Sequence, residues 1–167
     1  MNRAELWVFA MATAQLSKAM KEKFVNLYMD WARRAAELSH ARRLHVGAVI
    51  VKDDTVISYG YNGMPAGWDN ECENIFWKPD GSAELRTKSE VLHAESNAIA
   101  KLAKSNNSGL GADLFVTHSP CIECAKLIYQ SGIGRVWYRE NYRDDSGIQF
   151  LEKSGVEVKK IEKTLDT

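Results

Sequence analysis

Two short clusters of metal-binding residue types stand out in this sequence. The first is His93-Ala94-Glu95, and the second runs from Cys121 to Cys124 directly after Pro120. One imidazole and two thiolates form a donor set that suits Zn²⁺. Three protein ligands leave the fourth tetrahedral position open for a water, as in a catalytic zinc site rather than a structural one. We therefore expect His93, Cys121 and Cys124 to bind zinc.

The sequence around the two cysteines predicts that both lie in the first turns of a helix. Ser119-Pro120 has the form of an N-cap followed by proline in the first turn, which would place Cys121 and Cys124 on one face. The positive end of the helix dipole favours the thiolates that a metal requires. A pair of core cysteines or a redox pair is the alternative for this motif alone, and the upstream histidine and glutamate favour the metal site.

Glu95 lies two positions from a predicted ligand, where a carboxyl group can act as general acid and base on a water whose pKa zinc lowers to about 7. On a regular helix, residues two apart point about 200° apart, so His93 and Glu95 would diverge. The capping-box pattern from Thr87 to Glu90 would start a helix too early for both to reach one site. We therefore predict that the helix begins near Leu92 or His93.

The composition is that of one globular domain with balanced charge. The chain has 167 residues, 45% of them hydrophobic, with 22 Lys+Arg against 22 Asp+Glu. These values exclude a disordered or low-complexity chain and predict a single domain. Zero net charge argues against long nucleic acids as partners, while remaining compatible with one or two bound phosphates. An odd number of three cysteines argues against a secreted disulfide scaffold, so we expect a cytoplasmic protein.

The first 19 residues differ in character from the rest. Residues 6–14 form an apolar run after Arg3 that resembles a signal peptide, but Glu5 offsets the single basic residue. No apolar run reaches the ~18 residues that a membrane-spanning helix needs. A regular amphipathic pattern begins at Met20. We therefore expect residues 1–19 to be an extension, residues 20–167 to form one domain, and no membrane to be bound.

The pattern of apolar residues predicts an α/β fold with a mixed five-stranded sheet and helices on both faces. A helix is expected from Met20, with an apolar face made of Phe24, Leu27, Trp31, Ala35 and Leu38. Residues 46–51 and 56–61 predict an antiparallel hairpin, and residues 62–90 a long irregular functional loop. A second helix follows from Glu95 to Leu102. Strands and helices then alternate, with strands at 114–117, 135–138 and 156–161 and helices at 121–130 and 148–154.

The sequence resembles the zinc-dependent cytidine and deoxycytidylate deaminase superfamily, whose nucleobase deaminases carry the H-x-E…P-C-x-x-C signature. Within it, the chain is most similar to phage-like deoxycytidylate (dCMP) deaminases. Four segments carry this likeness, at residues 46–50, 60–65, 93–99 and 116–133. The resemblance implies a three-layer α/β/α cytidine-deaminase-like fold and hydrolysis of dCMP to dUMP and ammonia, which would supply dUMP for thymidylate synthesis.

The resemblance also implies roles for individual residues. His93, Cys121 and Cys124 would hold zinc, Glu95 would shuttle protons, and the backbone N–H of Cys121 would stabilise the charge that develops on the attacking oxygen. Asn62 corresponds to the residue that bonds the sugar hydroxyl, and the backbone at Ala94 and Ser119 would read the base. Tyr142, near the end of a strand and beside Arg143, would either close the site over the nucleotide or simply pack. The candidates for binding the phosphate are four arginines: Arg42, Arg43, Arg139 and Arg143.

Members of this family are commonly homo-hexamers that dCTP with Mg²⁺ activates and dTTP inhibits. The resemblance therefore implies a regulatory site here, around Gly63 and the pair Arg42-Arg43. Some phage relatives carry a second, structural zinc in the loop region. This chain has only Cys72 there, so we expect one zinc per chain and a free thiol at Cys72.

Two other functions share these motifs. A deaminase of tRNA adenosine or of cytosine in single-stranded DNA would use the same zinc site, with bases stacked on aromatics such as Trp68, Phe76 and Trp77. A catalytically silent, zinc-stabilised nucleotide-binding module would need no general base, and the presence of Glu95 argues against it. A free-nucleoside cytidine deaminase fits less well, because that branch usually has cysteine at the position of His93.

Overall fold

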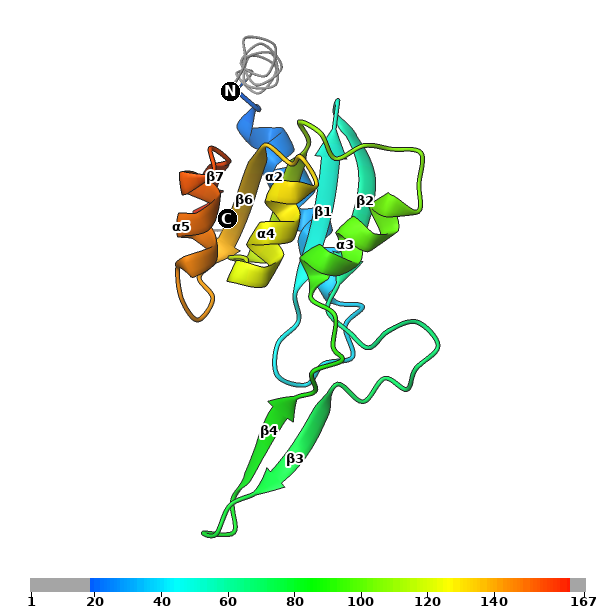
Figure 1. Cartoon of the computed structure of the whole chain (residues 1–167), viewed down its shortest axis with the longest axis vertical. Helices are drawn as coiled ribbons and strands as arrows, with labels where there is room; N and C mark the ends of the chain where they lie inside the picture. Colours follow the sequence, from blue (N-terminus) through cyan, green and yellow to red (C-terminus); the bar gives the residue numbers. More distant parts are fainter. Residues whose placement is uncertain (1–18, 163–167) are drawn as a thin grey trace.

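A mixed five-stranded sheet forms the centre of the protein (Figure 1), and the computed structural model describes residues 19–162. The strand order is β2-β1-β5-β6-β7. β1 pairs antiparallel with both β2 and β5, while β5, β6 and β7 run parallel. The strands are β1 (Gly47–Lys52), β2 (Thr55–Tyr61), β5 (Asp113–His118), β6 (Arg135–Glu140) and β7 (Glu157–Lys160). The predicted five-stranded sheet with an antiparallel first pair is confirmed.

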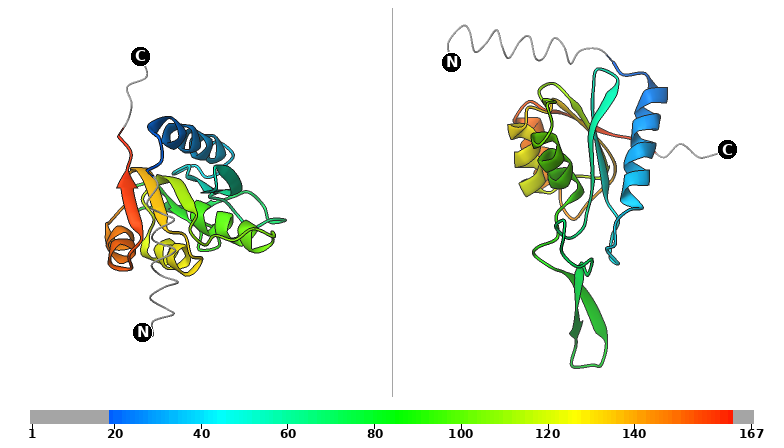
Figure 2. Two further views of the ribbon diagram at one scale, coloured as in Figure 1. Left: turned by 90° about the horizontal axis from the view of Figure 1, so that it is seen from above. Right: turned by 90° about the vertical axis from the view of Figure 1, so that its right-hand side faces the viewer.

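Helices cover both faces of this sheet, which gives the predicted three-layer α/β/α fold (Figure 2). α2 (Glu22–Ala36) packs on one face, and α3 (Ala94–Ala103), α4 (Ile122–Gln130) and α5 (Ser146–Lys153) pack on the other. Side chains alternate along β1, because successive residues of a strand point to opposite faces. Ala48 and Ile50 join the core under α3 and α4, whereas Val49 and Val51 join the core under α2.

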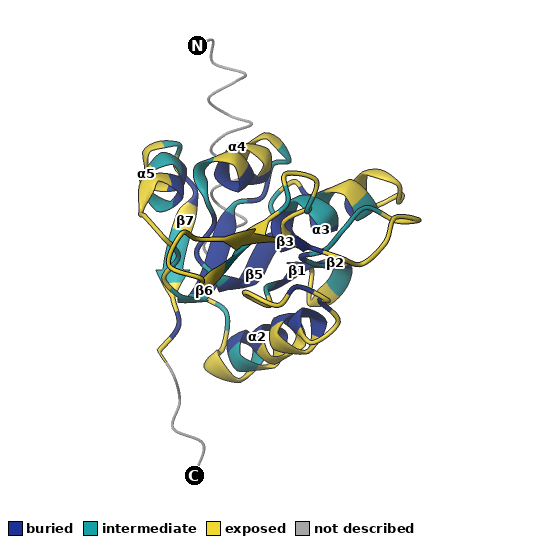
Figure 3. Ribbon diagram, turned by 90° about the horizontal axis from the view of Figure 1, so that it is seen from below, coloured by how far each residue is buried: buried dark blue, intermediate teal, exposed yellow. Residues whose placement is uncertain are grey.

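The face of α2 that packs on the sheet differs from the predicted one. Its buried residues are Val25, Tyr28, Met29, Ala32, Ala35 and Ala36. The predicted residues Leu27, Trp31 and Leu38 are instead about half exposed, and Leu38 lies beyond the end of the helix. Figure 3 shows that the side of α2 facing away from the sheet is largely exposed. The reason is the close approach of α2 to β1, where a Cβ at Gly47 would lie 1.9 Å from the carbonyl oxygen of Ala32. At this crossing only the small side chains of Ala32 and Ala36 fit between helix and strand, whereas the larger Val25, Tyr28 and Met29 are buried nearer the start of the helix.

Residues 62–90 are not irregular throughout, as the sequence had suggested. They contain an antiparallel hairpin of β3 (Glu73–Trp77) and β4 (Ala83–Thr87), which projects away from the main sheet (Figure 1). Gly81 adopts φ 83° in the turn, and Lys78 N–H bonds to the carbonyl of Ser82. The run Ile75-Phe76-Trp77, made of residue types that favour strands, was a signal that the prediction missed.

Two findings concern the ends of the chain and membranes. Within residues 19–162, no helix combines the length and the apolarity that crossing a membrane requires. The predicted N-terminal extension, apart from its last residue, lies outside the described residues.

Gly60 sets how closely α3 packs on β2, and this contact positions the start of α3. A Cβ at Gly60 would lie 2.2 Å from the carbonyl oxygen of Ala94 and 2.5 Å from the nitrogen of Ala98. We expect Gly60→Ala to lower the free energy of unfolding by about 1–3 kcal/mol, because α3 has to move away from the sheet. Thermal or urea unfolding measures this change.

The matched control is Gly63→Ala, just beyond the same strand. The nearest atom that a Cβ at Gly63 would meet is 4.0 Å away, in the ring of Tyr61. We expect this control to change stability by no more than about 0.5 kcal/mol. Equal destabilisation by the two substitutions would show that the close contact at Gly60 is not the cause.

Candidate metal centre and active site

Three metal-binding side chains converge where α3 and α4 begin. Nδ1 of His93 lies 3.5 Å from Sγ of Cys121 and 3.4 Å from Sγ of Cys124, and all three donor atoms are within 4.8 Å of one another. A tetrahedral zinc with ordinary Zn–N and Zn–S bond lengths separates nitrogen and sulfur by about 3.6 Å. The donor set and its spacing therefore fit a zinc ion. Within residues 19–162 this is the one such group of His, Cys or acidic side chains.

Both helices begin at these residues, which explains the convergence. His93 is the N-cap of α3, with extended backbone at φ −75° and ψ 156°, and Cys121 is the N-cap of α4, at φ −71° and ψ 168°. The predicted helix start near His93 is confirmed, and Thr87 of the capping-box pattern belongs to β4. Because His93 is outside the regular helix, it and Glu95 line the same cavity.

The predicted helix start at Ser119-Pro120 is wrong by two residues. α4 begins at Ile122, after the N-cap Cys121. Oγ of Ser119 accepts a hydrogen bond from the backbone N–H of Tyr142 at 2.7 Å instead of capping α4. This bond joins the loop after β5 to the loop after β6, so the two walls of the cavity are tied together.

Glu95 is a buried carboxyl group beside the three donors. Its residue is only 4% exposed, and this burial raises the pKa of Glu95 to about 7, with His93 acting in the opposite direction. Desolvation favours the neutral acid, whereas a neighbouring positive charge favours the carboxylate. A group with a pKa near the working pH both accepts and returns protons readily. The environment of Glu95 thus suits a general acid and base.

The two cysteines differ in how readily they lose a proton. Hydrogen bonds from the Cys124 thiol and from His93 lower the pKa of Cys121 to about 3. The bond to Cys121, together with burial, raises the pKa of Cys124. At neutral pH the pair therefore already holds one thiolate, the form in which cysteine binds metals.

A cavity of about 250 Å³ opens beside these residues. It brings together most of the predicted site residues: Asn62, His93, Ala94, Glu95, Ser119, Cys121, Tyr142 and Arg143, as well as Arg43. The predicted residues that are not part of its lining are Gly63, Arg42, Arg139 and Cys124, the last of which is buried. Its other walls include residues that the sequence reasoning did not anticipate, among them Leu44, Glu73, Thr87, Val91 and His118.

Asn62 also holds one wall of the cavity in place. Its Oδ1 accepts the N–H of Val46 at 2.8 Å, and its Nδ2 donates to the carbonyl of Leu44 at 2.8 Å. The amide therefore bridges the loop before β1, with one N–H and one lone pair left over. Asn62 can meet a ligand only with this remaining capacity.

The cavity distinguishes the four candidate arginines. Arg43 and Arg143 line it, and neither has an ion-pair partner among residues 19–162: Arg43 bonds to the Thr87 hydroxyl and Arg143 stacks on Tyr142. Arg42 instead pairs with Glu71 at 3.4 Å, outside the cavity. Nε of Arg139 is buried and has no hydrogen-bond partner within the same residues.

Comparisons with known proteins agree with this geometry. The sequence profile of the family described as "Cytidine and deoxycytidylate deaminase zinc-binding region" matches residues 20–140. The deoxycytidylate deaminase of Enterobacteria phage T4 is 37% identical over 154 residues, covering 71% of this chain and 79% of that protein. ComE operon protein 2 of Bacillus subtilis is 37% identical over 137 residues, covering 81% of this chain and 69% of that protein.

A solved structure shows the same fold. The dCMP deaminase of cyanophage S-TIM5, in complex with dCMP and dUMP, is 43% identical and superposes with a TM-score of 0.77, covering 86% of this chain and all of that one. The profile match extends over well more than half of the 167 residues and includes His93, Glu95 and both cysteines. The chain therefore belongs to the cytidine and deoxycytidylate deaminase family.

Proposed function

We propose that this protein catalyses the hydrolytic deamination of dCMP to dUMP and ammonia, and so supplies dUMP for thymidylate synthesis. The observation that carries this proposal is the buried carboxyl group of Glu95 in one cavity with His93 and Cys121, two of the three zinc-fitting donors, and the third, Cys124, lies within 4.8 Å of both. The phage and cyanophage relatives are named for this activity, which supports dCMP as the substrate.

We propose that His93, Cys121 and Cys124 hold one zinc ion per chain. When bound, zinc supplies a water of lowered pKa as the nucleophile. Cys72 is buried, and the metal-binding group within residues 19–162 does not include it. This agrees with one zinc rather than two.

Glu95 moves the protons in this proposal. Its carboxylate accepts a proton from the attacking water, whose oxygen forms the new bond to carbon 4 of the pyrimidine. Glu95 then donates this proton to ring nitrogen 3, takes the remaining proton from the new hydroxyl group on carbon 4 and passes it to the exocyclic amino group. The bond between carbon 4 and that nitrogen breaks, so ammonia leaves and a carbonyl group remains. The burial that raises the pKa of Glu95 to about 7 makes both directions of transfer accessible near neutral pH.

The remaining lining residues bind and orient the nucleotide. We assign Asn62 to the sugar hydroxyl and the backbone at Ala94 and Ser119 to the edge of the base; the N–H of Cys121 stabilises the developing negative charge. Tyr142 covers the site. Arg143 and Arg43 bind the phosphate, because they are the two candidate arginines in the cavity lining.

Regulation by dCTP with Mg²⁺ as activator and dTTP as inhibitor is part of the proposal. Gly63 and Arg42 are the candidate effector site; Arg43, the third residue expected there, lines the substrate cavity instead. Two backbone hydrogen bonds join Gly63 to Leu92, at 3.1 and 2.9 Å, and Leu92 directly precedes His93. This bridge offers a short physical route from an effector at Gly63 to the metal centre.

We further propose a cytoplasmic homo-hexamer in which residues 20–167 form one deaminase domain after a 19-residue extension. The start of the family match at residue 20 supports this division. Exposed apolar side chains support assembly: Leu27 and Trp31 on α2, Leu38 just after it, and Ile75 and Trp77 on the hairpin. Such surfaces are commonly interfaces between chains. Thiolate ligands favour a reducing compartment.

A nucleic-acid deaminase is the second candidate, because Trp68 and Trp77 are 58% and 74% exposed and bases can stack on such rings. We expect turnover of dCMP, and none of a single-stranded DNA oligonucleotide or tRNA, when ammonia release is measured with dCMP, CMP, dCTP, cytidine and each nucleic acid. The assay is run with and without dCTP and Mg²⁺, and added dCTP should raise the rate with dCMP. Turnover confined to a nucleic acid would reject dCMP as the substrate.

The role of Glu95 is tested by Glu95→Gln, which preserves shape but cannot transfer protons. We expect turnover to fall by about 10²–10⁴-fold, the usual contribution of general acid–base catalysis. Elemental analysis should still find one zinc per chain.

The control is Glu123→Gln, between the two cysteines, where the carboxylate is exposed and paired with Lys126 at 2.7 Å. It should keep wild-type turnover. Loss of zinc from Glu95→Gln would make Glu95 a ligand, and two zinc ions in the unaltered protein would contradict a single site.

Assembly is tested at the outer face of α2. We expect light scattering to give the mass of a hexamer, and Trp31→Glu to lower it, because a charge replaces a large apolar contact at an interface. Arg33→Glu, at an exposed position of the same helix that points about 200° away from Trp31, is the control and should keep the hexamer. A monomer in the unaltered protein would refute the proposed assembly.

A further inference from the structure

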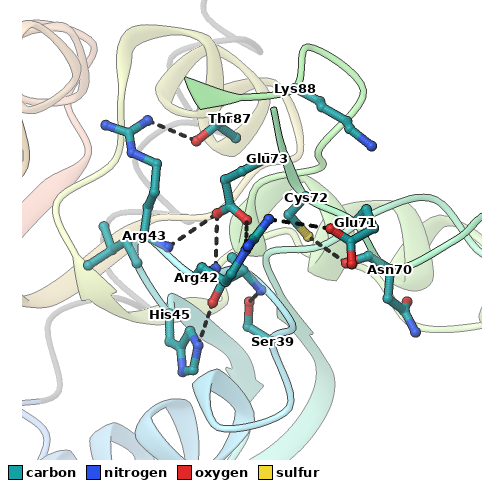
Figure 4. Close-up of polar contacts among 12 residues, drawn as sticks. Ser39, Arg42, Arg43, His45, Asn70, Glu71, Cys72, Glu73, Thr87 and Lys88 are labelled. Carbon is teal, nitrogen blue, oxygen red and sulfur yellow. Dashed lines mark hydrogen bonds and ion pairs between the residues drawn. The ribbon is translucent and has the colours of Figure 1, made fainter. Parts of the chain in front are cut away.

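A buried carboxylate lies at the base of the β3–β4 hairpin, beside the cavity. The side chain of Glu73, the first residue of β3, is 1% exposed. Its Oε1 accepts the backbone N–H groups of Arg42 at 3.0 Å and Arg43 at 3.2 Å (Figure 4). Its Oε2 accepts no hydrogen bond within residues 19–162 and faces Nε of Arg42 at 3.8 Å. A buried charge is costly unless it is compensated, so this arrangement binds the loop before β1 firmly to the hairpin.

The side chains of the two consecutive arginines, Arg42 and Arg43, point in different directions from this anchored main chain. The guanidinium of Arg42 lies between Glu73 and Glu71, so carboxylates neutralise its charge. The side chain of Arg43 extends to the other strand of the hairpin, where Nη1 donates to Oγ1 of Thr87 at 3.0 Å (Figure 4). Arg43 therefore lines the cavity without a carboxylate partner among the described residues.

Glu73 and Thr87 face each other as a register pair where the hairpin joins the body of the protein. One residue of the pair holds the main chain of Arg43, and the other holds its guanidinium. Both line the cavity. Fixing a guanidinium at two points lowers the entropy that it loses when it forms its two-pronged contact with a phosphate.

We propose that Glu73 is a positioning residue that holds Arg43 toward the 5′-phosphate of the substrate, so that the base of the hairpin selects a nucleotide over a nucleoside. This inference rests on the proposed function and extends it to an element that the sequence reasoning treated as a loop. Glu73 touches no reacting atom and acts through Arg43. The only substrate group that it affects strongly is the phosphate.

The test compares dCMP with deoxycytidine, which lacks the phosphate. We expect Glu73→Gln to raise KM for dCMP by about tenfold, as loss of a hydrogen bond to a charged group does, with a much smaller effect on kcat and on turnover of deoxycytidine. A purely structural role would impair both substrates alike. Removing a nearby negative charge would, by Coulomb's law alone, lower KM for dCMP, so a fall in KM would also overturn the proposal.

The matched control is Glu71→Gln, two residues earlier, which removes a carboxylate from exposed Arg42 and touches neither Arg43 nor the cavity. We expect it to change KM for dCMP less than twofold, the small effect of an exposed ion pair. A tenfold rise in this control would show that the charge of the region, and not the placement of Arg43, controls phosphate binding.

A double-mutant cycle tests whether Glu73 acts through Arg43. Arg43→Ala should raise KM for dCMP, and adding Glu73→Gln should raise it little further, because the group that Glu73 positions is gone. Independent, multiplying effects would refute the positioning role. If Glu73→Gln does not fold, Thr87→Val provides the test, since it removes only the hydroxyl that holds Arg43, and an unchanged KM for dCMP would then count against the proposal.

Direct binding separates this inference from the proposed reaction. If the unaltered protein deaminates neither substrate, the proposed function fails, but calorimetry with dUMP and deoxyuridine still measures phosphate recognition. A preference for dUMP that Glu73→Gln reduces would support the inference. A preference for dUMP that the substitution leaves intact would overturn it.

Discussion

The function of this protein depends on one geometric constraint: two helices must each begin at a metal-binding residue, with their first turns a few ångströms apart. His93 and Cys121 are extended N-caps, so their side chains turn toward each other, and Nδ1 of His93 lies within 3.5 Å of both sulfurs. Glycines allow the packing that sets these starting points. Gly60 lets α3 approach β2, and a Cβ at Gly147 would lie 2.0 Å from the carbonyl oxygen of Pro120, directly before Cys121.

Much of the fold and the central part of the site could be predicted from the sequence because the signals are local. His93 and Glu95 can face one site only if α3 starts near His93, so their spacing predicts this start although the capping-box pattern predicts a start at Thr87. A short β-branched run at residues 46–51, a polar turn and a returning run at 56–61 likewise predicted the antiparallel first pair of the sheet. These features depend on residues that are close in sequence.

The features that the sequence did not reveal depend on contacts between distant segments. The apolar residues of α2 do recur with helical spacing, as predicted. Which side of the helix faces the sheet depends on the close approach of Ala32 to Gly47, and this approach leaves Trp31 exposed to solvent. Similarly, Arg42 and Arg43 are equivalent in sequence. The buried carboxylate of Glu73, thirty residues after Arg43, accepts the backbone N–H groups of both. It lies beside the guanidinium of Arg42, whereas Arg43 lines the cavity.

Under the proposed function, the placement of these charges explains how a chain with zero net charge selects a small anion. The arginines outside the cavity that pair with carboxylates, such as Arg34 with Glu37 and Arg42 with Glu71, add little to the field at a distance, because salt screens exposed charges beyond about 10 Å. Arg43 and Arg143 are in the cavity and have no carboxylate partner among residues 19–162. Their charges act mainly on a ligand within the cavity. A long polyanion would need a continuous basic face, whereas a mononucleotide needs only these two groups. The chain can therefore have no net charge overall and still present two positive charges to a small anion in the cavity.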